Sequence, residues 1–158
     1  MSQSITYKIR HGQPSEADYL TALVMRSQGS WGYPDAWMDL WRERLTITSE
    51  MMEGMVTLIA EDQGVIKGFW CRTPEWSVEK PTRGFFFVEP DAIRQGCGRQ
   101  LFQAMKVELL KRHVDAFSII VEPKAVPFYL KMGGMKISEI ESNVPIRMLP
   151  VIHFDLTK

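Results

Sequence analysis

The chain has 158 residues, of which 45% are hydrophobic and 24% charged, the composition of an ordinary globular protein. Nineteen basic residues balance nineteen acidic ones, so the net charge favours neither nucleic acid nor a membrane surface as a partner. No stretch is apolar over the roughly 18 residues of a membrane-spanning helix, and MSQSITYKIR lacks the apolar core of a signal peptide. Cys71 and Cys97 have no metal-ligand spacing and fit free thiols. We therefore expect a cytoplasmic protein with one domain over residues 1–158 and no metal site.

The first part of the chain predicts one strand followed by helices. Alternation over Ile5–Arg10 predicts the strand. A helix capped by Ser15 follows and ends near Gly29. After the loop WGYP, a second helix begins at Pro34, and Ser49 caps a short helical turn.

From residue 55 onward the pattern predicts strands broken by two helices. MVTLIAED and VIKGFWCRT form a hairpin that turns at Gln63-Gly64, and RGFFFVEP is a third strand, covered on both faces. A helix over Cys97–Arg112, the strand FSIIVE and a short helix ended by Gly133 come next, before the strands MKISEIE and MLPVIHFDL. The order β-α-α-β-β-β-α-β-α-β-β predicts an α+β protein with helices on the faces of a mixed sheet.

The stretch VEPDAIRQGCGRQLFQAM places Gly96 and Gly98 between a strand and a helix. It lacks the third glycine of a dinucleotide fingerprint and the Gly-Lys-Ser/Thr of a Walker loop. The helix N-terminus still favours an anion, the glycines allow close backbone approach, and Arg94 and Arg99 flank the loop. The alternative is that the glycines only form a tight helix entry. The stretch alone leaves both interpretations open.

A second motif, VEPKAVPFYLKMGG, follows the next strand, and the two together resemble the GNAT superfamily of acetyl-CoA-dependent N-acetyltransferases. The residues that match the first family motif are Val88, Glu89, Pro90, Gly96 and Gly98. Those that match the second are Ala125, Phe128, Tyr129 and Gly133. The chain departs from the family pattern at Ile93 in place of Gln or Arg, at Glu122 in place of Asn, and at Gly134 in place of an aromatic residue.

The resemblance implies the GNAT fold, an α+β arrangement with a mixed, mostly antiparallel sheet of about six to seven strands flanked by about four helices. Two central parallel strands, FFFVEP and FSIIVE, splay apart in this fold, and the pantetheine arm of acetyl-CoA lies between them. Backbone amides of the glycine loop then hold the pyrophosphate. The implied cofactor-binding residues are Phe86, Phe87, Val88, Ile93, Arg94, Gln95, Gly96, Cys97, Gly98, Arg99, Lys124 and Phe128.

The resemblance also implies the chemistry: direct transfer of an acetyl group to a primary amine of a small molecule. Tyr129 matches the position of the general acid that protonates the CoA thiolate; the alternative is that it only packs a helix against the sheet. The family's glutamate base corresponds to Thr82, which cannot act as a base. The base therefore stays unassigned among relayed water and the side chains Glu75, Glu89, Glu122 and His153.

The acceptor region is rich in aromatic residues. A similar S-x-x-x-W-G-Y segment, with a C-terminal R-M-L-P, occurs in a poorly characterised GNAT subgroup. We expect Trp31, Tyr33 and Trp76 to wall the acceptor pocket and Arg147 to bind an acidic group of the acceptor, whereas Trp37 and Trp41 face the core. Two alternatives remain: a non-catalytic acyl-CoA-binding protein, and a protein or peptide N-acetyltransferase. A homodimer is a further expectation.

Overall fold

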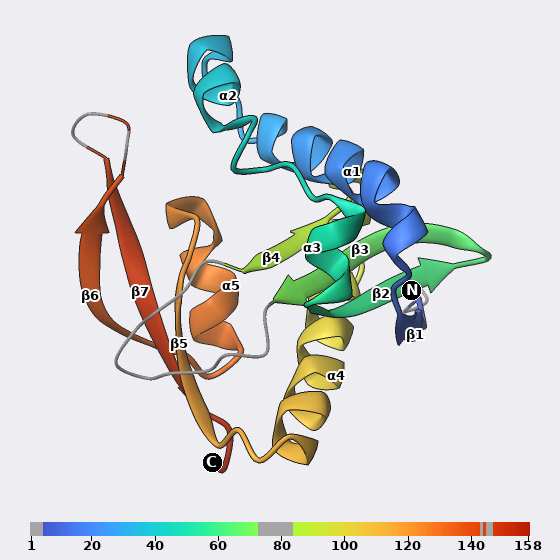
Figure 1. The fold of residues 1–158 in the computed structure, drawn as a ribbon. Coiled ribbons are helices and arrows are strands. Elements are labelled where there is room, and N and C mark those ends of the chain that lie inside the picture. The colour runs from blue at the N-terminus through green and yellow to red at the C-terminus, as the bar shows by residue number, and fades with distance from the viewer. Residues whose placement is uncertain (1–4, 73–83, 143, 145–146) are drawn as a thin grey trace. The chain divides into compact units, whose positions relative to one another are not determined.

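A computed structural model of the chain describes residues 5–72, 84–142, 144 and 147–158 (Figure 1). These residues form seven strands, five α-helices and three short 3₁₀ turns. They divide into two compact units. Described residues within 1–74 and 85–105 make up the first unit, and those within 75–84 and 106–158 make up the second.

The first unit is built on an antiparallel sheet with the strand order β1-β2-β3-β4. Its strands are β1 (Lys8–His11), β2 (Val56–Asp62), β3 (Val65–Arg72) and β4 (Phe85–Val88). Its helical elements are η1 (Pro14–Glu16), α1 (Ala17–Gly29), α2 (Asp35–Trp41), α3 (Ser49–Glu53), η2 (Pro90–Ala92) and the start of α4 (Cys97–Lys111). The first strand therefore begins three residues later than predicted.

The hairpin between β2 and β3 turns where the sequence predicts. Asp62 pairs with Val65, and the two residues between them, Gln63 and Gly64, have φ angles of 51° and 79°. Two consecutive positive φ angles are the geometry of a type I′ turn, whose twist matches that of the flanking strands. The glycine adopts this conformation at no steric cost, whereas Gln63 does not.

The two faces of this sheet are covered by different helices (Figure 1). On one face, Leu20 and Leu23 of α1 are fully buried with Phe69 of β3, and the rings of Phe85 and Phe87 stack on Phe69 at 6.5 and 6.3 Å. On the other face the start of α4 packs against Gly68. A Cβ placed on Gly68 would lie 2.8 Å from Cys97 Sγ and 3.1 Å from Leu101 Cδ1, so a residue without a side chain is required there.

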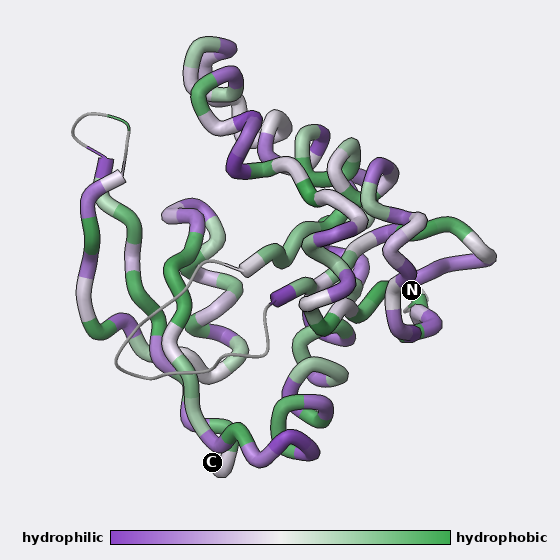
Figure 2. Tube along the Cα trace, in the orientation of Figure 1, coloured by the Kyte–Doolittle hydropathy of each residue, from purple (hydrophilic) through white to green (hydrophobic). Residues whose placement is uncertain are grey.

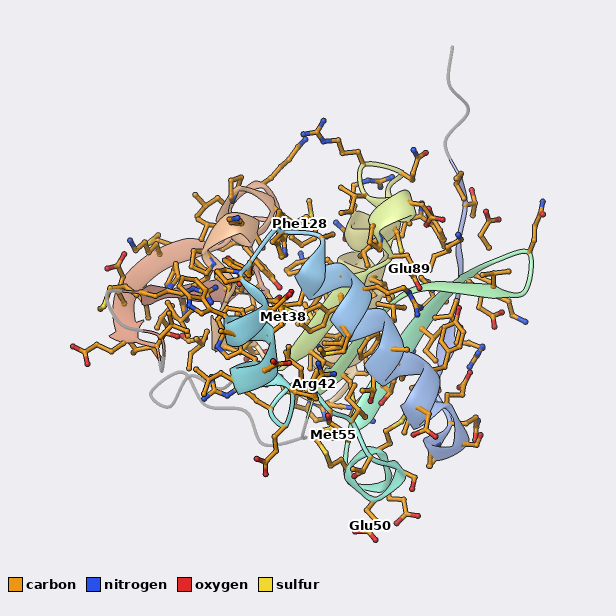
Figure 3. The ribbon with its side chains drawn as sticks, turned by 90° about the horizontal axis from the view of Figure 1, so that it is seen from above. Met38, Arg42, Glu50, Met55, Glu89 and Phe128 are labelled. Carbon is orange, nitrogen blue, oxygen red and sulfur yellow. The ribbon has the colours of Figure 1, made fainter. Side chains whose placement is uncertain are left out.

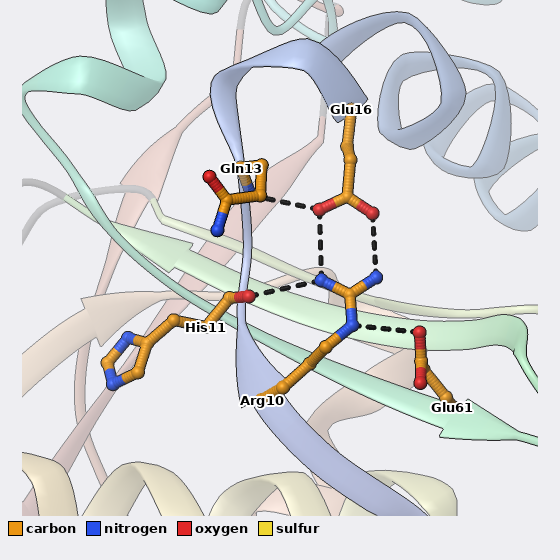
Figure 4. A network of polar contacts seen from close by, with 5 residues as sticks. All are labelled: Arg10, His11, Gln13, Glu16 and Glu61. Atoms are coloured by element: carbon orange, nitrogen blue, oxygen red, sulfur yellow. Dashed lines mark hydrogen bonds and ion pairs between the residues drawn. The ribbon is translucent and has the colours of Figure 1, made fainter.

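An ion-pair network ties β1 to the helix entry and to β2 (Figure 4). Arg10 donates through Nη1 and Nη2 to both carboxylate oxygens of Glu16, at 3.0 and 2.7 Å, and through Nε to Glu61 at 2.8 Å. Glu16 also accepts from the backbone N–H of Gln13 at 2.9 Å, which completes a capping box. The predicted cap, Ser15, lies inside η1 instead. The cap of this helical turn is Gln13, two residues earlier than predicted.

The cap of the third helix also lies one residue before the predicted one. Thr48 Oγ1, rather than the Ser49 hydroxyl, accepts from the backbone N–H of Met51 at 3.1 Å. Both residues are of types that cap helices well. The extended backbone of Thr48 decides between them, because a capping residue stands outside the helical conformation.

The second unit holds an antiparallel sheet with the order β5-β7-β6. Its strands are β5 (Ala116–Ile120), β6 (Met135–Glu141) and β7 (Met148–Asp155), and its helical elements are η3 (Pro123–Ala125), α5 (Val126–Lys131) and the end of α4. Gly133 has φ 103° just after α5, which confirms it as the residue that ends this helix. Both β5 and β7 are mostly apolar (Figure 2), and residues 149–152 of β7 are buried without a break. Tyr129 of α5 packs against Phe154 of β7, with the ring centroids 6.2 Å apart.

The α+β fold class is confirmed. All recorded strand pairs are antiparallel, and the two strands expected to splay apart, β4 and β5, belong to different sheets. The residues of β4 are half-buried rather than covered on both faces, since β4 is the last strand of its sheet. In the part of the chain that the structure describes, no helix has the length and apolar character needed to span a membrane.

Candidate functional site

The loop before α4 has an unusual backbone. Arg94 and Gly96 both have positive φ angles, 66° and 85°. Such alternation turns successive N–H groups toward one side, which forms an anion-binding concavity. The first helical bond of α4 runs from Gln100 N to Gly96 O at 3.0 Å. The amides of residues 97–99 thus precede the first bonded turn and are available to an anion at the N-terminus of a 15-residue helix.

The acidic and the basic side chains of this segment have different surroundings. Its two carboxylates are held by cations from other elements: Asp91 by Lys67 of β3 at 3.1 Å, and Glu89 by Arg26 of α1. Arg94 and Arg99 are exposed, and neither forms an ion pair with any residue that the structure describes. The loop therefore presents positive charge to solvent, as an anion site requires.

Cys97 contributes no reactive thiol to this loop. Its side chain is fully buried, and burial raises the pKa of the thiol to about 12. A thiol with that pKa carries almost no thiolate at neutral pH and is a poor nucleophile. The part of Cys97 that can serve an anion is its backbone amide.

The outer edge of β4 carries backbone groups at alternate residues. Glu89 N donates to Lys67 O at 2.7 Å, and the register places Phe87 opposite Phe69 as the next hydrogen-bonded pair. The N–H and C=O groups of Phe86 and Val88 therefore point away from β3. On that side, no described strand pairs with β4, so an extended ligand can add to the sheet there. Phe87 instead faces β3 with its backbone and the core with its ring.

The aromatic residues after α1 form a packed cluster. The ring of Tyr33 lies 5.7 Å from Trp37 and 5.2 Å from Trp41, and those two indoles are 5.8 Å apart. Trp41 is buried, whereas Tyr33, Trp37 and Trp31 are half-buried. Trp41 therefore lies in the core, as predicted, whereas the rings of Trp31, Tyr33 and Trp37 are partly exposed at the surface. Trp76, the other predicted pocket residue, lies outside the described residues.

In the second unit, Tyr129 is buried between aromatic rings. It retains only 7% of its exposure, and it meets Phe128 edge-on at 5.2 Å and Phe154 at 6.2 Å. Burial raises the pKa of the phenol, so the hydroxyl stays protonated through the neutral range. A protonated phenol is the form that a general acid needs.

A partly buried ion pair joins two residues that are 25 positions apart in the sequence. Arg147 Nη2 lies 2.5 Å from Glu122 Oε2, and their side chains are only 11% and 16% exposed. The other carboxylate oxygen accepts from the backbone N–H of Lys124 at 3.4 Å. The charge of the Glu122 carboxylate is therefore compensated by Arg147. No local sequence signal identifies this partner for Arg147.

Comparison with known proteins identifies the family. The family model for the acetyltransferase (GNAT) domain matches residues 34–151, a range that includes parts of both units. The chain belongs to this family. No curated protein sequence matches this chain.

Solved structures show the same fold at low sequence identity. A GCN5-related N-acetyltransferase from Rhodopseudomonas palustris is 18% identical, with a TM-score of 0.77 over 98% of this chain and 99% of that one. The PaiA N-acetyltransferase from Thermoplasma acidophilum, in complex with coenzyme A, is 13% identical, with a TM-score of 0.75 over 96% and 99%. YncA from Salmonella typhimurium, solved with acetyl-CoA, is 16% identical, with a TM-score of 0.68 over 96% and 94%.

Three of the four side chains considered as a base in this GNAT domain have described surroundings. Glu89 and Glu122 are committed to ion pairs with arginines. His153 bonds Ser118 Oγ through Nδ1 at 3.1 Å, on the face of β7 opposite to Phe154 and hence to Tyr129. Glu75 lies outside the described residues.

The predicted site residues of the GNAT domain fall into two groups. The first unit carries Trp31, Tyr33, Phe86, Phe87, Val88 and residues 93–99, and the second unit carries Lys124, Phe128, Tyr129 and Arg147. In the described part of the chain, no three His, Cys, Asp or Glu side chains gather as a metal ion would require. Sequence reasoning missed Arg26 and Lys67, the cations that hold the two loop carboxylates.

Proposed function

We propose that this GNAT protein is an acetyl-CoA-dependent N-acetyltransferase that transfers an acetyl group to a primary amine of a small molecule. The observation that carries the proposal is the loop before α4. Its backbone has positive φ at Arg94 and Gly96, and its helix-start amides and the side chains of its two arginines bond no residue that the structure describes. A diphosphate is the ligand that such a loop fits best. Membership of the GNAT family supports acyl transfer as the reaction.

The residues present fit coenzyme A at its two polar parts. The amides of residues 97–99 and the guanidinium groups of Arg94 and Arg99 would hold the pyrophosphate. Gly96 has a left-handed backbone conformation, which is strained for any residue with a Cβ. A glycine at this position therefore lets the loop form the anion-binding concavity without strain. The outward backbone groups of Val88 would pair with an amide of the pantetheine arm.

When bound, acetyl-CoA supplies an activated acetyl thioester. The amine nitrogen attacks the thioester carbonyl carbon; the C–N bond forms, the C–S bond breaks, and the departing sulfur takes the proton of the Tyr129 hydroxyl. The Tyr129 phenol carries that proton throughout the neutral range, as a proton donor must. A relayed water is the base that removes the amine proton in this proposal, since Glu89 and Glu122 are held in ion pairs.

The acceptor side is proposed from Trp31 and Tyr33. Both rings are half-buried, and the ring of Tyr33 packs against the indoles of Trp37 and Trp41 in α2. Aromatic faces attract ammonium groups and the carbon skeletons that carry them. A small amine with an apolar body suits this surface better than a long basic peptide does.

The test is a screen of small primary amines with acetyl-CoA as donor, read by the release of free CoA thiol. We expect amine-dependent release with at least one amine, and binding of CoA in a thermal-shift assay. A thermal shift without thiol release from any amine would favour the alternative, a non-catalytic acyl-CoA-binding protein. The absence of a CoA-induced shift would overturn both.

A further inference from the structure

The carboxylate of Glu89 lies at the junction between β4 and the proposed phosphate loop. Both of its oxygens are taken by Arg26, whose Nε donates to Oε2 at 3.1 Å and whose Nη2 pairs with Oε1. Figure 3 shows Glu89 beside α1, the helix that carries Arg26. The fork of the guanidinium thus matches the carboxylate at two points, the strongest geometry for this pair.

Arg26 is itself held in place. It stands in the last turn of α1, and its guanidinium carbon lies 5.8 Å from the ring centroid of Tyr19. The pairing with Glu89 raises the pKa of Arg26 further, so the cation is permanent. Glu89 is 13% exposed, so its charge is only partly screened by solvent.

The pair of Arg26 and Glu89 is one of two ion pairs that compensate the acidic side chains of the loop. Each carboxylate of the segment is bound by a cation from outside it, whereas Arg94 and Arg99 pair with no described residue. Glu89 is five residues before Arg94, so at most about 18 Å of extended chain separates them. An uncompensated carboxylate at that range repels a diphosphate at low salt.

We propose that Arg26 determines the affinity of the loop for anionic cofactors by compensating the charge of Glu89. This inference rests on the proposed function of the loop as the CoA diphosphate site. Arg26 does not touch the cofactor in this account. It acts through Glu89, and its contribution is the cancelled negative charge rather than the mechanical link between α1 and β4.

The test measures the Kd for CoA by calorimetry at about 20 mM and about 500 mM salt, two conditions with very different screening. Arg26→Met should raise Kd about threefold to fivefold at low salt and much less at high salt. Arg26→Lys, which keeps the charge and loses the fork, should stay near the wild-type Kd. Glu89→Gln should bind CoA as tightly as wild type or more tightly, and the double variant Arg26→Met/Glu89→Gln should regain wild-type affinity.

The matched control is the pair of Arg112 and Glu108 near the far end of α4. Their side-chain exposures, 42% and 17%, are close to the 46% and 13% of Arg26 and Glu89. Helix geometry places them about 20 Å along α4 from the loop, so Arg112→Met should leave the Kd unchanged. Urea unfolding of every variant confirms that it is folded.

Two results would overturn the inference. If Glu89→Gln weakens CoA binding as much as Arg26→Met does, at both salt concentrations, the pair acts as a mechanical tether. If Arg26→Met binds CoA like wild type, the pair has no effect on the loop. Both results leave wild-type CoA binding intact and therefore spare the proposed function, whereas a wild-type protein without CoA affinity removes both.

Discussion

Replacement of Arg94 by glycine should stabilise the protein and weaken its hold on CoA at the same time. Arg94 adopts φ 66°, a left-handed conformation that costs an L-residue about 1–2 kcal/mol. Glycine removes that cost but gains about 0.5–1 kcal/mol of freedom in the unfolded chain. The net stabilisation is about 0.5–1 kcal/mol, which raises Tm by about 2 °C in a domain of this size.

The same change removes one exposed cation from the proposed diphosphate site. A solvent-screened contact of this kind contributes about 1 kcal/mol, so the Kd for CoA should rise about fivefold. Arg94 thus lowers the stability of the fold and strengthens binding of the ligand. This trade is typical of strained residues at functional sites.

Differential scanning fluorimetry gives the Tm, and calorimetry gives the Kd. Arg94→Ala keeps the strain and loses the charge, so it should raise Kd about fivefold without a gain in Tm. Gln63→Gly relieves the same strain in the β2–β3 turn, where φ is 51°, and should raise Tm without changing Kd. An Arg94→Gly variant with wild-type CoA affinity would refute the role of this arginine, and a lowered Tm would refute the strain argument.

Two further predictions concern stability. Arg10 lowers the pKa of Glu16, so the pair stabilises the fold above the usual carboxyl pKa of 4.5, and that contribution is lost as pH falls through the lower, folded-state value. Urea unfolding should show Glu16→Gln less stable than wild type at pH 7, with a difference in the free energy of unfolding that shrinks as the pH falls below 4.5. A difference independent of pH would contradict the linkage. Gly68→Ala should destabilise by about 1–3 kcal/mol, because its Cβ would meet Cys97 Sγ at 2.8 Å and Phe87 O at 3.2 Å. In a Cys97→Ala background most of that loss should disappear, and an equal loss in both backgrounds would place the clash elsewhere.

Local sequence signals predict those parts of the fold in which neighbouring residues decide the conformation. Gln63-Gly64 forms the hairpin turn, Gly133 ends α5, and α4 begins directly after Gly96, where expected. In each case the backbone preference of one or two residues suffices. The family resemblance then supplied the fold class.

Interactions between distant residues could not be predicted in this way. Arg26 and Glu89 are 63 positions apart, and Gln100 bonds the backbone of Tyr7 from 93 positions away. Nothing near Glu89 distinguishes a carboxylate held by an arginine from one exposed to solvent. The left-handed conformation of Arg94 was equally hidden, since its residue type gives no sign of positive φ.

The central claim is acetyl transfer with Tyr129 as the proton donor, and a steady-state comparison of wild type with Tyr129→Phe tests it most directly. Phenylalanine preserves the ring contacts with Phe128 and Phe154 and removes only the hydroxyl. With an amine that supports thiol release, the variant should lose about a hundredfold or more in kcat while its Kd for CoA stays within about twofold. A Tyr129→Phe protein that turns over at the wild-type rate would contradict the account.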